Sequence, residues 1–151
     1  MRVFHLTEDG IAKLKTELAE LQSRRRAMTE RLQSTKDYGD LAENPEYETV
    51  RQESELLTSR ITVVRDILEH VKLIKTGTGS QTVVLGAVVS LQHNGREEQF
   101  TIVETIEADP TSGKISDKSP LGSTLMGKAV GDEVVIKTPV KTLLYRIIAI
   151  K

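Results

Sequence analysis

The stretch YGDLAENPEY, which runs from Tyr38 to Tyr47, divides the first half of the chain into two mirrored parts. On both sides of it, apolar residues recur in alternating steps of three and four, the spacing by which helices pack along a coiled-coil seam. Before the stretch, in reverse order, the seam positions are Thr35, Leu32, Met28, Arg25, Leu21, Leu18, Leu14 and Ile11. After it they are Tyr47, Val50, Ser54, Leu57, Ile61, Val64, Leu68 and Val71. The mirrored pattern predicts two long helices folded into an antiparallel hairpin.

Local signals suggest where both predicted helices begin and end. Thr7 is suited to cap the first helix, although Gly10 is expected to loosen its first turn. Gly39 can end that helix, and Asn44 can cap the second one, which is predicted to continue to about Lys75. With about 30 residues in each arm, the hairpin should reach roughly 45 Å at 1.5 Å per residue.

Three seam positions, Arg25, Thr35 and Ser54, are polar, whereas the other 13 of the 16 are apolar. Polar residues in a seam can fix the register of the two helices. Alternatively, they indicate that the half of the hairpin nearer the bend is built to contact a partner. The pattern leaves both interpretations open.

Beyond the hairpin, predicted over residues 1–75, the periodicity of the sequence changes. Residues 76–82 are rich in Gly, Ser and Thr and are predicted to form a linker. Residues 83–151 are predicted to form a C-terminal domain with an antiparallel sheet and one short helix, which makes the chain an α+β protein. Ser119 and Pro120 open that helix.

Alternating apolar residues and turn signals predict the strands of the C-terminal domain. The predicted strands cover residues 83–92, 99–104, 134–137 and 143–150. Asn94-Gly95 predicts a tight hairpin turn after the first of them, and Asp109 and Gly131 mark further turns.

The composition excludes several classes of function. The 151 residues include 21 basic and 22 acidic ones, so the formal net charge is −1 and a general coat for nucleic acid is not expected. Any nucleic-acid contact should be local and supported by a protein partner. Cysteine is absent and the three histidines are scattered, which argues against a zinc site. No signal peptide or membrane-spanning run is evident, so a cytoplasmic location without membrane association is expected.

The predicted bend carries two carboxylates, Asp40 and Glu43, three positions apart. They can satisfy free backbone N–H groups at the start of the second helix, but Asn44 already suits that cap. Two acids at the end of a rigid rod can instead help hold a Mg²⁺ ion or orient a water molecule. Because two exposed carboxylates alone bind Mg²⁺ weakly, they would form half of a site that another macromolecule completes.

Three motifs together resemble one known family. They are Leu6-Thr7 followed by Gly10, the bend segment 39–47, and Ser119-Pro120-Leu121-Gly122 with Gly127-Lys128. On these residues the chain resembles the bacterial Gre transcript-cleavage (transcription elongation) factors, of the GreA type. The resemblance covers nearly the whole chain.

This resemblance implies an FKBP-like C-terminal domain that docks at the entrance of the secondary channel of RNA polymerase. The hairpin would enter that channel, where Asp40 and Glu43 help to hold the polymerase's second Mg²⁺ and position the attacking water. The backtracked 3′ end of the nascent RNA would then be cleaved by the polymerase. The chain would be no enzyme, have no cofactor of its own and act as a monomer.

The resemblance also indicates contact residues. Those expected to contact nucleic acid or polymerase are Arg31, Lys36, Tyr38, Asn44 and Arg51. Those assigned to docking on polymerase are Ser119, Pro120, Leu121 and Gly122. Lys36 stands where the family often has Arg, and Ala27 stands where Pro is common. The alternative for the basic residues is that they are solvated helix charges paired with neighbours such as Glu55.

Three rival functions compete with the stimulation of cleavage. The first is a paralogue of the same fold that enters the channel and inhibits polymerase without cleavage, against which the retained Asp40 and Glu43 argue. The second is a prolyl isomerase, for which Phe100 and Tyr145 are too few aromatic walls. The third is a coiled-coil scaffold in which the acids of the bend have no role.

Overall fold

The computed structural model describes residues 2–36 and 45–151, and the side chains of Thr35 and Lys36 are not described. The chain forms two compact units. The first consists of Ile11–Val71 with the residues before Phe4, and the second consists of Phe4–Gly10 and Lys72–Lys151. Within the described residues, neither long helix has an apolar stretch suited to crossing a bilayer.

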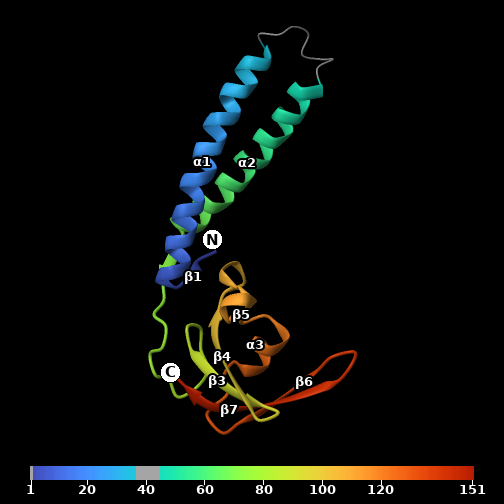
Figure 1. Cartoon of the computed structure of the whole chain (residues 1–151). Coiled ribbons are helices and arrows are strands. Elements are labelled where there is room, and N and C mark those ends of the chain that lie inside the picture. Colours follow the sequence, from blue (N-terminus) through green and yellow to red (C-terminus); the bar gives the residue numbers. More distant parts are fainter. Residues whose placement is uncertain (1, 37–44) are drawn as a thin grey trace. The chain divides into compact units, whose positions relative to one another are not determined.

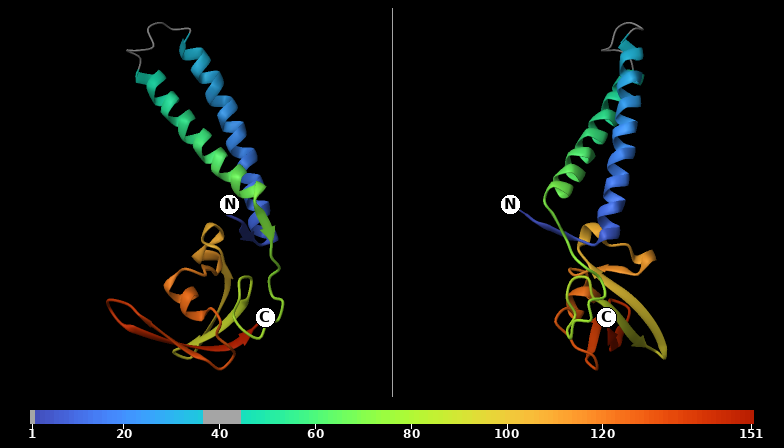
Figure 2. Two further views of the ribbon diagram at one scale, coloured as in Figure 1. Left: turned by 180° about the vertical axis from the view of Figure 1, so that it is seen from behind. Right: turned by 90° about the vertical axis from the view of Figure 1, so that its left-hand side faces the viewer.

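The first unit is a helical hairpin. Helix α1 (Glu8–Lys36) and helix α2 (Pro45–Glu69) lie side by side in both figures (Figures 1 and 2). The predicted seam is confirmed, because all of its described residues are buried or half-buried. The most fully buried of them are Leu14, Leu21, Val50, Ile61 and Val64. The residues of the bend, 37–44, lie outside the described part of the chain.

The end of the second helix differs from the prediction. Helix α2 ends at Glu69 rather than near Lys75, and residues Val71–Leu73 form strand β2, which pairs with strand β1 (Phe4–Leu6). The backbone N–H of Ile74 donates to the carbonyl of Leu6 at 2.8 Å. The prediction was wrong because the partner for this backbone comes from the start of the chain, which helical periodicity does not reveal.

The second unit contains a curled five-stranded sheet (Figure 2). Its order is β5-β4-β3-β7-β6, and only the β4–β5 pair is parallel. The strands are β3 (Val88–His93), β4 (Arg96–Val103), β5 (Lys114–Ser116), β6 (Glu133–Lys137) and β7 (Thr142–Ile150). The antiparallel sheet is thus confirmed, whereas the three-residue β5 was missed because it is too short to show alternation.

Short elements complete the second unit. His93 pairs with Arg96, so Asn94 and Gly95 form the predicted two-residue turn. The predicted short helix is α3 (Pro120–Leu125), and two 3₁₀ turns, η2 (Thr105–Glu107) and η3 (Pro110–Ser112), lie between β4 and β5. The buried core residues are Val83, Ala87, Val89, Leu91, Ile102, Leu125, Val134 and Ile147. The α+β fold predicted from the sequence is confirmed.

Candidate functional site

The acids predicted to act at the bend, Asp40 and Glu43, lie outside the described residues, as do Tyr38 and Asn44. Lys36 is the last residue of α1. Within residues 2–36 and 45–151, no three His, Asp or Glu side chains are grouped so as to hold a metal ion. The roles assigned to the bend therefore stay predictions.

Arg51, on α2 close to the bend, is held by two glutamates of its own helix. Its Nε donates to Glu48 Oε2 at 3.3 Å and its Nη1 to Glu55 Oε1 at 2.5 Å, and Nη2 also pairs with Glu48. Hydrogen bonding to Glu48 raises the pKa of Arg51, and the same bond lowers the pKa of Glu48. The side chain stays 40% exposed, and ion pairs this open to water contribute little to stability. Arg51 can therefore exchange a carboxylate for a phosphate at little cost.

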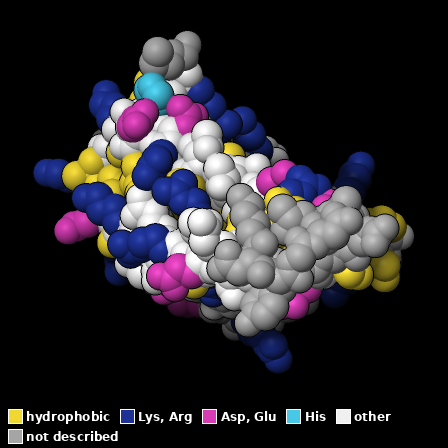
Figure 3. All heavy atoms as spheres, turned by 90° about the horizontal axis from the view of Figure 1, so that it is seen from above, with side chains coloured by type: hydrophobic (Ala, Val, Ile, Leu, Met, Phe, Trp, Pro, Cys, Tyr) yellow, Lys and Arg dark blue, Asp and Glu magenta, His cyan; other side chains and the backbone are white. Residues whose placement is uncertain are grey.

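Arg31, another of the predicted contact residues, is exposed on α1. Its Nη1 lies 3.9 Å from the sulfur of Met28, and no described carboxylate pairs with it. Within the described part of the chain, Arg31 and Arg51 share no hydrogen-bond partner. On the face shown in Figure 3, basic and acidic side chains are interspersed, as the near-neutral net charge predicts.

The segment Ser119–Gly122 has a clear structural role. Ser119 Oγ accepts the N–H of Gly122 at 3.0 Å and donates to the carbonyl of Ser116 at 2.7 Å, so it caps α3. Pro120 occupies the first turn of the helix, where no N–H is needed. A Cβ at Gly122 would lie 1.9 Å from the Ser116 oxygen, so the approach of α3 to β5 requires glycine.

Only part of this segment is available to a partner. Pro120 is exposed and Leu121 is half-buried against the core, whereas Gly122 is buried and the Ser119 hydroxyl is used internally. The docking role of the four residues stays a prediction, and Pro120 is the member best placed for it.

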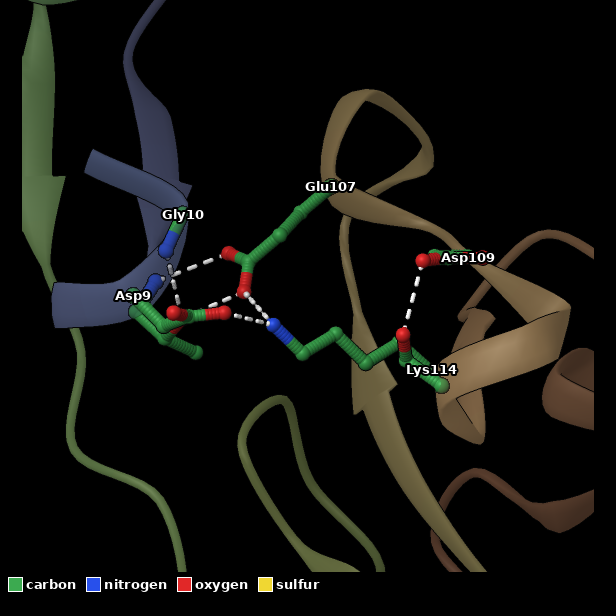
Figure 4. Close-up of polar contacts among 7 residues, drawn as sticks. Asp9, Gly10, Glu107, Asp109 and Lys114 are labelled. Atoms are coloured by element: carbon green, nitrogen blue, oxygen red, sulfur yellow. Dashed lines mark hydrogen bonds and ion pairs between the residues drawn. The ribbon is translucent and has the colours of Figure 1, made fainter. Parts of the chain in front are cut away.

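The start of α1 is anchored by Glu107, a residue that sequence reasoning missed (Figure 4). Its carboxylate accepts the N–H of Thr7 at 2.9 Å and also the hydroxyl of Thr7. Thr7 is the predicted cap, since its Oγ1 accepts the N–H of Gly10 at 3.2 Å. The expectation that Gly10 loosens this turn stays a prediction, but the structure gives this glycine a further role. A Cβ there would lie 2.5 Å from the Glu107 carboxyl, so glycine admits the carboxylate.

Lys114 completes this polar cluster. Its Nζ pairs with the Asp9 carboxylate and lies 3.6 Å from Glu107 Oε2, and the Glu107 side chain is only 3% exposed (Figure 4). Burial alone would lower the pKa of Lys114, but the carboxylates of Asp9 and Glu107 outweigh it and raise the pKa. Because Glu107 and Lys114 lie about 100 positions from their partners, no local pattern could have identified them.

We expect Gly10→Ala to lower the free energy of unfolding by about 1–2 kcal/mol, although alanine favours helices. The new methyl group would displace the Glu107 carboxylate from its bonds to Thr7. In a Glu107→Ala background the same change should be neutral or stabilising by up to about 1 kcal/mol. Urea unfolding of the four proteins of this cycle measures the coupling, and additive effects would contradict the assigned contact.

The raised pKa of Lys114 predicts a pH dependence with a definite sign. Its ion pairs should contribute fully to stability below the ordinary lysine pKa of 10.5 and be lost as the pH rises through the higher folded value. The stability difference between wild type and Lys114→Met should therefore stay constant from about pH 7 to 9 and shrink above about pH 10.5. Chemical unfolding across this range measures it. A difference that grows with pH would contradict the ion pairs.

Comparison with known proteins identifies the family. The family model described as "Transcription elongation factor, N-terminal" matches residues 4–73, and the one described as "Transcription elongation factor, GreA/GreB, C-term" matches residues 78–151. The chain belongs to the GreA/GreB family of transcription elongation factors. Only residues 74–77, which follow β2, lie between the two matches, and together the matches include every motif on which the resemblance was based.

Individual GreA/GreB relatives are similar to this chain over nearly its full length. The chain is 40% identical to transcription elongation factor GreA of Bacillus licheniformis over 153 residues, covering 99% of this chain and 97% of that one. It is 38% identical over 152 residues to GreA of Bacillus subtilis, with the same coverage. Among solved structures, the GreA factor homolog 1 (Gfh1) protein of Thermus thermophilus is 31% identical and covers 99% of both chains, with a TM-score of 0.48.

Proposed function

We propose that this protein binds RNA polymerase through the secondary channel and stimulates the polymerase's own cleavage of backtracked nascent RNA. The observation that carries the proposal is the pair of acids, Asp40 and Glu43, in the segment between the two helices of a chain that belongs to the GreA/GreB family. The protein is an elongation factor and not an enzyme, because the reaction belongs to the polymerase. It acts as a monomer on the 3′ end of the RNA.

The helical hairpin is long and narrow. Helix α1 has 29 residues and so spans roughly 44 Å at 1.5 Å per residue. Its seam against α2 is apolar, with Val50 and Val64 fully buried. Two packed helices are thin enough to enter a channel that a globular domain cannot.

The chemistry of the bend follows from its donors. Carboxylate oxygens are preferred ligands of Mg²⁺, so Asp40 and Glu43 fit a shared site whose remaining ligands come from polymerase. When bound, the metal stabilises charge on the attacking and leaving oxygens of the phosphodiester. Asp40 and Glu43 supply oxygen ligands and accept hydrogen bonds from the attacking water, which orients it.

In this proposal, basic residues near the bend contact the phosphates of the RNA. Arg31 has no described carboxylate partner, and Arg51 can exchange an exposed glutamate for a phosphate. Lys36, Tyr38 and Asn44 lie at or within the bend segment and would contact RNA or polymerase. The C-terminal unit would dock at the channel entrance by the surface that includes Pro120.

A cleavage assay on purified, stalled elongation complexes tests the proposal. Adding the protein should shorten 5′-labelled RNA from its 3′ end and restore elongation once nucleotides are added. Unshortened RNA together with slower synthesis would support the inhibitory paralogue. Phe100 packs against the core, and the ring of Tyr145 lies against that of His93 with centroids 4.8 Å apart, so both aromatic rings already have partners within the domain.

A further inference from the structure

The middle of the hairpin has a groove between the two helices, and Arg31 is the one lining residue to which the proposed function gives a role. It encloses about 420 Å³, within the range of ligand-binding pockets. The residues that line it are Arg24, Ala27, Met28, Arg31, Glu53, Leu56, Leu57 and Arg60. Its floor is apolar, and Leu56 is 72% exposed. A leucine this exposed beside other apolar groups leaves a surface open to a partner.

The spacing of the lining residues makes the groove a two-helix feature. Those on α1 recur at steps of three, one and three positions, and those on α2 follow the same steps from Glu53 to Arg60. Residues with this spacing share one helix face over two turns, roughly 10 Å. Ala27 contributes a small side chain to the lining of the groove, and Leu56 contributes a large apolar one. Grooves of this kind accept one face of an amphipathic helix.

The rim of the groove is positive. Three arginines stand against one glutamate, although the chain as a whole has a net charge of −1. Arg60 is bound by Glu17, from Nε to Oε1 at 2.7 Å. Arg24 and Arg31 pair with no carboxylate among the described residues. Two guanidinium groups that pair with no described carboxylate, beside an apolar floor, are complementary to an acidic segment that carries a bulky apolar side chain.

We propose that this groove binds an acidic amphipathic helix of RNA polymerase, an inference that rests on the function proposed above. The partner helix places a bulky apolar side chain against Ala27 and Leu56 and its carboxylates against Arg24 and Arg31. A second copy of this chain fits less well, because matching grooves would set arginines against arginines. The contact lies about three helical turns from the bend, so it adds affinity without taking part in cleavage.

Equilibrium competition for core RNA polymerase against labelled wild-type protein tests the groove. Leu56→Ala and Ala27→Phe, which remove the apolar contact and fill the groove, should each weaken binding about tenfold. Arg24→Glu with Arg31→Glu should weaken it by more than about tenfold. All four positions are half-exposed or exposed helix-surface sites, so thermal unfolding should show intact hairpins.

Matched controls come from the same helix. Val63 is 48% exposed on α2 outside the groove, and Arg65 is exposed there too. Val63→Ala and Arg65→Glu should bind polymerase like wild type. Leu56→Ala and Ala27→Phe should regain full cleavage at saturating protein, whereas changes to Asp40 and Glu43 should not. Failure of the cleavage proposal is thereby distinguished from failure of the groove proposal.

Several results would overturn the inference. One is unchanged affinity of the Leu56 and Ala27 variants, and another is absence of polymerase binding by the wild type. If only the arginine changes weaken binding, and they equally weaken binding to a single-stranded RNA oligonucleotide, the groove is a phosphate contact. If sedimentation shows a wild-type dimer that Leu56→Ala dissociates, the groove is an interface between two copies.

Discussion

Replacing Asp40 and Glu43 together by alanine should lower stimulated RNA cleavage by about 100-fold or more, because metal and water would lose their carboxylate ligands. Binding to RNA polymerase should stay within about threefold of wild type, since the seam and the C-terminal unit are untouched. Single-turnover cleavage at saturating protein measures the first effect, and equilibrium competition measures the second. Raising the Mg²⁺ concentration should restore part of the lost rate.

The matched control is the pair Asp40→Asn and Glu43→Gln, which keeps shape and hydrogen-bonding oxygens but removes charge. It should cleave nearly as poorly as the alanine protein. Unchanged cleavage in both variants would support the scaffold interpretation. A fall in unfolding free energy above about 2 kcal/mol in the alanine protein would instead show that the acids cap the helix start.

Gly122→Ala should be the most destabilising single substitution in the C-terminal unit, costing about 3 kcal/mol or more. The added Cβ would lie 1.9 Å from the carbonyl oxygen of Ser116, far inside van der Waals contact. Backbone atoms cannot move aside as a flexible side chain can. Helix α3, which carries the core residue Leu125, would therefore have to shift away from the core. Urea unfolding followed by circular dichroism measures the loss.

Ser123→Ala is the matched control for this prediction, because Ser123 is exposed on the same helix. It should change stability by no more than about 0.5 kcal/mol. A Gly122→Ala protein as stable as wild type would contradict the close approach of α3 to β5. The docking role of the segment is better tested with Pro120→Ala. Because Pro120 is exposed, this change should not unfold the domain, and weaker binding of the variant to polymerase would report on docking itself.

The hairpin could be predicted because its information is local and repeated. Every described seam position is buried or half-buried, and the polar members Arg25 and Ser54 are half-buried, near the groove. The end of α2 could not be predicted, because the backbone of Val71–Leu73 pairs with β1, which lies near the start of the chain. Helical periodicity carries no information about such a partner.

The motifs of the candidate site were found from the sequence, but their physical roles required coordinates. Ser119 and Pro120 were recognised as a helix start, whereas the need for glycine at 122 comes from Ser116, in a neighbouring strand. The close approach of Glu107 to Gly10 was missed, because Glu107 lies far away in the chain.

By itself, the sequence determined that this protein has two long helices that pair as a hairpin, followed by an α+β domain, and it predicted two acids at the bend. It could do so because helix period, strand alternation and caps depend on neighbours within a few positions. Only the tertiary structure decided which residues meet across the chain. The anchoring of Thr7 by Glu107, the close contact at Gly122 and the arginine-rimmed groove all join segments distant in sequence, and packing alone brings these together.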